Sequence, residues 1–153
     1  DILYCIIERY SQPLLKKLEN LAYQEDKDAT EKLRLFIQLT LVKEQDVTAE
    51  NAVLQEAVDL DENRYMLDRF YHKLCGSVAG YFAHIIEQGN REGVFQVASP
   101  EETASFLMTG YIFVSNDAKF TCRSMEELQG YLKAYKILLE RALGSSKPLF
   151  PED

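Results

Sequence analysis

Apolar and polar residues follow a helical period along most of the chain. The longest such stretch runs from residue 62 to residue 88 without a proline, and its apolar residues form two neighbouring rows. Two rows make a stripe wider than one partner helix needs, which is typical of a helix packed on two sides. Gly89 and Gly93 follow, and glycine easily takes the left-handed conformation found at helix ends. The pattern predicts a long central helix that ends at these glycines.

Three shorter helices are predicted before the central one. Residues 2–24 are amphipathic, and Pro13 in their middle predicts a kink because proline removes one backbone donor. Asp28, with Glu31 three residues later, is a plausible capping pair for the second helix. Residues 46–60 are expected to form a third, weaker helix.

Two more helices are predicted after the central one. Ser99 followed by Pro100 and two glutamates is a strong helix start, and the nearly all-apolar helix that follows is expected to end near Ser115. Ser124 caps the last helix, which ends at Gly144. The pattern therefore predicts an all-α fold, a single domain of about six helices around the long central one.

Charge and hydropathy exclude several classes of partner. The chain has 153 residues, enough for one domain, and a net charge of -8 with a pI near 4.8. An acidic surface repels phosphate backbones, so the chain as it stands should not bind nucleic acid directly. Its apolar runs are too short to span a bilayer and no signal peptide opens it, so we expect no membrane partner. Because it begins inside an amphipathic pattern and without Met, we expect a fragment or a processed chain.

The cysteines and histidines do not form a recognisable reactive or metal-binding motif. Cys5, Cys75 and Cys122 are widely spaced, which indicates reduced thiols in a cytoplasmic protein rather than disulfides or a zinc ribbon. His72 and Cys75 are three residues apart on the central helix, but no further ligand follows at a diagnostic spacing. We therefore expect no metal, no cofactor and, since no catalytic motif is present, no enzyme activity.

Four segments follow one another in a distinctive order: DILYCIIERY, a long helix ending in IIEQGNREGVF, then ASPEETASFLMTGYIFV, and a final amphipathic helix. This order resembles the C-terminal domain of TetR-family transcriptional regulators. In that family the same order of features recurs at this place. A helix is followed by a glycine, then by a second glycine that precedes a hydrophobic and an aromatic residue, and then by a helix that starts with P-E-x-x-A. Here the matching residues are Gly89, Gly93, Val94, Phe95, Pro100, Glu101 and Ala104.

The resemblance implies a function for the whole chain. Residues 1–153 would be an effector-binding and dimerisation domain, with residues 1–24 as the helix that connects it to a DNA-binding head. Nothing in the chain resembles the T-x-x-x-I-A-x-x-A-G-V-S core of that head, so DNA would be bound only through an absent N-terminal domain. The acidic charge agrees with this interpretation, because the head normally supplies the basic surface.

Small or polar residues interrupt the apolar faces and predict a pocket between helices. Multi-helix domains commonly hold ligands there, and an apolar, aromatic lining favours a small hydrophobic or aromatic effector. Simple core packing is the alternative for each candidate. The candidate ligand-binding residues are Phe36, Thr40, Tyr71, His72, Cys75, Met108 and Tyr111.

The last two long helices carry more apolar surface than one chain should be able to cover. We expect them to pair with their copies as a four-helix bundle in a homodimer, and burial within the monomer is the alternative. The candidate interface residues are Phe106, Gly110, Phe113, Leu128, Tyr131, Tyr135 and Leu139. A second hypothesis for the function is a helical protein–protein interaction module without a small-molecule ligand, which a tightly filled core would favour.

Overall fold

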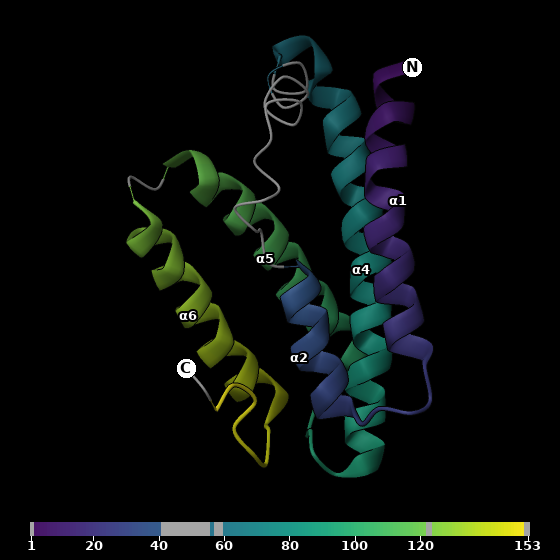
Figure 1. The fold of residues 1–153 in the computed structure, drawn as a ribbon, viewed down its shortest axis with the longest axis vertical. Coiled ribbons are helices and arrows are strands. Elements are labelled where there is room, and N and C mark those ends of the chain that lie inside the picture. The colour runs from purple at the N-terminus through teal and green to yellow at the C-terminus, as the bar shows by residue number, and fades with distance from the viewer. Residues whose placement is uncertain (1, 41–55, 57–59, 122–123, 152–153) are drawn as a thin grey trace.

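The computed structural model describes residues 2–40, 56, 60–121 and 124–151, and this part of the chain contains helices and no strand (Figure 1). The elements are α1 (Ile2–Tyr23), α2 (Ala29–Thr40), a 3₁₀ turn η2 (Asp61–Asn63), α4 (Arg64–Glu92), α5 (Pro100–Thr121) and α6 (Met125–Leu143). The predicted all-α fold with a long central helix is confirmed. The helix predicted over residues 46–60 lies, apart from residues 56 and 60, outside the described residues.

Helix α4 is the element against which α1, α2 and α5 pack. Figure 1 shows α1 beside α4 and running in the same direction, with α2 against the lower half of α4 and pointing the opposite way. Helix α5 starts near the lower end of α4 and diverges from it upward, and α6 returns beside α5. Among the helices, α6 therefore contacts mainly α5.

The end of α4 differs from the prediction at one of its two glycines. Gly93 has a φ of 76° and caps the helix, as expected. Gly89 lies inside the helix and is buried, and a methyl group there would lie 2.0 Å from Cδ2 of Phe95. The prediction that Gly89 ends the helix is wrong, because this glycine makes room for the Phe95 ring instead of reversing the backbone.

The predicted helix starts are confirmed by their hydrogen bonds. The backbone N–H of Glu31 donates to the Asp28 carboxylate at 2.8 Å at the start of α2. The N–H of Glu127 donates to the Ser124 hydroxyl at 3.2 Å at the start of α6. Each bond satisfies a backbone donor that the first turn of a helix leaves without an intrahelical partner.

Two helices continue where the sequence suggested an irregularity or an end. Helix α1 is assigned without interruption through Pro13. Helix α5 starts at Pro100 as predicted but continues past Ser115 to Thr121. No glycine or proline lies between Ser115 and Thr121, so nothing in the backbone forces an end there.

The described apolar side chains form two separate clusters. The main one joins α1, α2, α4, α5 and α6, and its fully buried large side chains are Leu18, Leu33, Phe36, Ile37, Phe82, Ile85, Ile86, Met108, Leu139, Leu143 and Leu149. A smaller one, around Ile7, Met66 and Phe70, lies between the N-terminal parts of α1 and α4. Helix α1 therefore packs on two clusters of different size.

A buried lysine connects three helix ends. Lys32 is 2% exposed, and its ammonium donates to the carbonyl of Ala22 at 2.9 Å and to Oε1 of Gln88 at 2.7 Å. Gln88 donates to Glu92 at 2.8 Å, and the other carboxylate oxygen of Glu92 accepts from the N–H of Ala29 at 2.9 Å. These bonds hold the end of α1 and the start of α2 against the end of α4. Burial lowers the pKa of Lys32, and nearby Glu92 opposes that shift.

Candidate functional site

The interior between α2, α4 and α5 is filled where the sequence placed two of the ligand-binding candidates. Phe36 and Met108 are fully buried in the main cluster. The ring of Phe36 lies 5.4 Å from that of Phe82, with an interplanar angle of 40°. Both residues therefore act as core side chains in this structure.

Three other candidates lie where α2, α4 and α5 meet. The Tyr111 hydroxyl donates to the carbonyl of Thr40 at 3.4 Å, which joins α5 to the end of α2. The buried Cys75 side chain on α4 lies near that of Thr109 on α5. Burial raises the pKa of both the Cys75 thiol and the Tyr111 phenol. Both groups are therefore uncharged at neutral pH, and the thiol lacks the activated form that a nucleophilic cysteine needs.

The remaining two candidates lie on different sides of α4. The ring of Tyr71 lies 5.5 Å from that of Phe113, so Tyr71 also bridges α4 and α5. His72 is exposed and its ring lies 3.5 Å from the Asp68 carboxylate on the same helix. The structure thus places Thr40, Tyr71, Cys75 and Tyr111 at helix contacts and His72 away from them.

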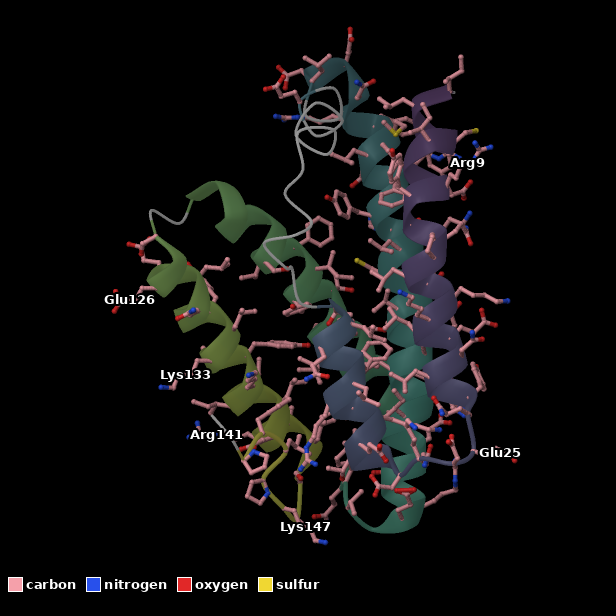
Figure 2. The ribbon with its side chains drawn as sticks, viewed as in Figure 1. Arg9, Glu25, Glu126, Lys133, Arg141 and Lys147 are labelled. Atoms are coloured by element: carbon pink, nitrogen blue, oxygen red, sulfur yellow. The ribbon has the colours of Figure 1, made fainter. Side chains whose placement is uncertain are left out.

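An apolar groove of about 270 Å³ lies between α5 and α6. Its lining residues are Phe106, Leu107, Gly110, Tyr111, Val114, Ser115, Leu128, Tyr131, Leu132, Ala134, Tyr135 and Leu138. The labelled charged residues Glu126, Lys133 and Arg141 of α6 point away from α5 (Figure 2). Helix α6 therefore turns one row of side chains, among them Leu128, Tyr131, Tyr135 and Leu138, toward this groove, and these charged residues toward solvent.

Five of the predicted dimer residues line this groove: Phe106, Gly110, Leu128, Tyr131 and Tyr135. Phe106 is 84% exposed, the highest value among the exposed large apolar residues, and Gly110 on the next turn has open space around it. Leu138, which we did not predict, also lines the groove and is 52% exposed. It follows Tyr131 and Tyr135 at helical spacing, a signal that the sequence contained.

The last two predicted interface residues are placed differently. Phe113 is 45% exposed, and its ring contacts Tyr71 on α4. Leu139 is fully buried inside the protomer, because it faces the main cluster and not the groove. A second copy could not reach Leu139 in this arrangement, so the prediction that it lies in the interface is wrong.

Two stacked tyrosines form the floor of the groove. The rings of Tyr111 and Tyr135 lie 4.6 Å apart with an interplanar angle of 29°. The Tyr135 hydroxyl donates to the carbonyl of Leu107 at 2.9 Å, and burial strongly raises its pKa. Tyr111 therefore belongs both to the candidate ligand residues and to the groove.

A second hollow, of about 330 Å³, lies along α4 between α1 and α5. Gly76 and Gly80 of α4 line it, and none of the predicted ligand residues does. At its edge the ring of His84 lies 4.3 Å from the ring of Tyr23 of α1. Burial, together with the nearby charge of Lys32, lowers the pKa of His84.

The described residues contain neither a metal-binding cluster nor a membrane-spanning helix. No group of three or more His, Cys, Asp or Glu residues among them could hold a metal ion. No helix in that part of the chain has the length and apolar character needed to cross a membrane.

The fold and the groove define a class: an all-helical domain whose last two helices present an apolar face outside the core. Residues 46–137, more than half of the chain, match the family described as "Tetracyclin repressor-like, C-terminal domain". The chain belongs to this family, whose domains are typically regulatory. No curated protein matches the chain.

Proposed function

We propose that the chain is the effector-binding and dimerisation domain of a TetR-like transcriptional regulator. Family membership supports the general role, since such domains sense ligands and dimerise. The observation that carries the proposal is the apolar groove between α5 and α6, beside the exposed Phe106. Contiguous exposed apolar surface of this kind marks an interaction site.

The proposed dimer is symmetric and forms through α5 and α6. In an isologous interface the same surface of each copy contacts its counterpart, so a protruding group needs a hollow on that same surface. Phe106 protrudes, and the groove and the open space at Gly110 lie beside it. Phe106 of one protomer would then pack into the groove of its partner.

The dimer is tested by the sedimentation of wild type and of Phe106→Glu. A carboxylate at this position would be buried without a partner, so the variant should be monomeric where wild type is dimeric. Tyr65→Glu is the matched control, because Tyr65 is 76% exposed but lies on α4, outside the groove residues. A monomeric wild type, or a dimeric Phe106→Glu, would contradict the proposed interface.

The proposed effector site lies where α2, α4 and α5 meet, around Thr40, Tyr71, Cys75 and Tyr111. The contacts of Tyr111 with Thr40, Cys75 with Thr109 and Tyr71 with Phe113 support it, since each joins two of these helices. Uncharged aromatic, hydroxyl and thiol groups favour an uncharged hydrophobic or aromatic effector with one or two hydrogen-bonding atoms.

The proposed mechanism is allosteric. An effector that binds one arrangement of the helices better than another shifts the population toward it. Helix α1 would transmit this change to a DNA-binding head, and the two heads of a dimer must match half-sites about one helical turn of DNA apart. A change in head spacing would then release the operator.

The effector site is tested by thermal unfolding with a panel of neutral aromatic compounds, such as indole, 1-naphthol and biphenyl derivatives. A compound that binds only the folded state raises the melting temperature. Tyr71→Leu should weaken that rise, and Tyr65→Leu, on the same helix but exposed, should leave it unchanged.

The second candidate function is a helical interaction module that dimerises and binds no small molecule. The full burial of Phe36 and Met108 favours it, because a filled core leaves less room for a guest. A dimer that no compound stabilises would support this module, whereas a dimer stabilised through Tyr71 would support the sensor.

A further inference from the structure

Helix α6 is attached to the domain at two places. Near its middle, Tyr135 stacks on Tyr111 and donates to the carbonyl of Leu107. Near its end, Leu139 and Leu143 are fully buried. Much of the rest of α6 is exposed, so these two attachments fix how its groove side is presented.

The C-terminal segment 145–150, here called the strap, folds back over the second attachment. Its Leu149 is fully buried in the main cluster, and the N–H of Leu149 donates to the Glu140 carboxylate of α6 at 2.8 Å. The guanidinium of Arg34, on α2, donates to the carbonyls of Leu149 and, at 3.2 Å, of Pro148. The strap therefore bonds to α6 and to α2, and also to the segment after α4, because the N–H of Ser146 donates to the carbonyl of Val94 at 3.1 Å.

Helix α2 also reaches the first attachment. The carbonyl of Thr40, at its C-terminal end, accepts the hydroxyl of Tyr111, whose ring stacks on Tyr135. Arg34 and Thr40 are six positions apart on one short helix, so α2 is connected to α6 at two points. Because α2 is connected at two points, both a shift and a tilt of this helix would be transmitted to α6.

We infer that α2 couples the interior of the domain to the dimer surface, through Tyr111 and through the strap. This inference rests on the proposed function, and it names the route by which the effector site and the dimer influence each other. Because coupling between two binding events is reciprocal, a dimer that orders α6 also stabilises α2, and an effector that orders α2 strengthens the dimer.

The reciprocal effect can be measured without an effector. Amide hydrogen exchange of α2 is compared between the wild-type dimer and the Phe106→Glu monomer, in the full chain. Exchange in α2, which lies outside the α5/α6 groove, should be about fivefold or more slower in the dimer, the lower range of allosteric couplings. Equal exchange in the two forms would overturn the inference while leaving the dimer intact.

Variants that break the two connections of α2, to the strap and to Tyr111, test whether these connections carry the effect of the dimer on α2. Arg34→Met removes the bonds to the strap, and Tyr111→Phe removes only the hydroxyl bond to Thr40 and keeps the stacked ring. Each should reduce the effect of the dimer on α2, and circular dichroism verifies that each variant folds. Arg69→Met is the control, since Arg69 lies over the ring of Tyr4, in the contact between α4 and α1.

The outcomes separate the two proposals. A monomeric wild type would remove both the proposed dimer and this inference. A dimer whose effect on α2 is unchanged in Arg34→Met and Tyr111→Phe would remove only the inference. Loss of the effect in Arg69→Met as well would show a general loosening of the domain and would also contradict the proposed route.

Discussion

Replacing Gly89 with alanine should destabilise the protein, although alanine is the better helix former. Gly89 lies inside α4, and a methyl group there would lie 2.0 Å from Cδ2 and 2.6 Å from Cε2 of the Phe95 ring. Phe95 is 4% exposed, and its N–H donates to the carbonyl of Gly89 at 3.1 Å. The backbone thus holds the ring close to the site of the substitution, and the ring has to leave its position.

The magnitude follows from two opposing effects. Displacing a buried phenylalanine ring costs about 3–5 kcal/mol, the range for removing such a ring from a core. Alanine in place of glycine gains about 1 kcal/mol in a helix interior. The net expectation is a loss of about 2–4 kcal/mol in the free energy of unfolding.

The assay is urea unfolding at one fixed protein concentration, because stability depends on concentration in a protein that dimerises. The matched control is Gly80→Ala in the same helix, where no atom lies within 4 Å of the added methyl group. This variant should gain about 0.5–1 kcal/mol. The two substitutions of glycine by alanine are therefore expected to have opposite signs.

A second background isolates the cause. In a Phe95→Ala protein the ring is absent, so Gly89→Ala should become neutral or stabilising there, and the two sites should be strongly non-additive. If Gly89→Ala were as stable as Gly80→Ala, or if its cost persisted without the ring, the close contact with Phe95 would not be the reason for this glycine.

Two further predictions concern Lys32 and His84. Lys32→Met keeps most of the side-chain volume but leaves one buried acceptor, the carbonyl of Ala22, and one partly buried acceptor, on Gln88, without their donor. It should therefore lower the free energy of unfolding in urea by about 1–3 kcal/mol. An unchanged free energy of unfolding would show that the ammonium makes no net contribution to stability. The pKa of His84 is lowered from its ordinary value of 6.5, so the unfolded chain takes up a proton first and stability should fall as pH drops below that value. His84→Gln should reduce this fall in urea unfolding measured across the acidic range, and an identical pH dependence in both proteins would contradict the assigned role.

Local signals in the sequence predicted the helices well because each signal acts within one turn. Asp28 and Ser124 cap the helices that they were expected to cap. Gly89 shows the limit of such signals. The sequence does not distinguish a glycine that makes room for a neighbouring ring from a glycine that adopts a left-handed backbone conformation. Only the position of Phe95 distinguishes them.

The candidate site was predictable in part, for a related reason. Helical spacing brought Phe106, Gly110 and Tyr131 to one groove, but it could not decide which side of α6 would hold the buried Leu139. That choice depends on the strap and on Tyr111, which are distant in sequence from the residues that they position. The exposed position of His72 likewise follows from how α4 is rotated against its neighbours, which no local pattern records.

Because the small cluster around Ile7, Met66 and Phe70 is separate from the main cluster, the two halves of α1 should open with different free energies. Its C-terminal half belongs to the main cluster and is also held by the bond from Lys32, whereas its N-terminal half rests on far fewer buried side chains. Segments with few buried apolar contacts open at a lower free energy than the whole domain unfolds. The N-terminal half of α1 should therefore open as a local unit while its C-terminal half stays folded.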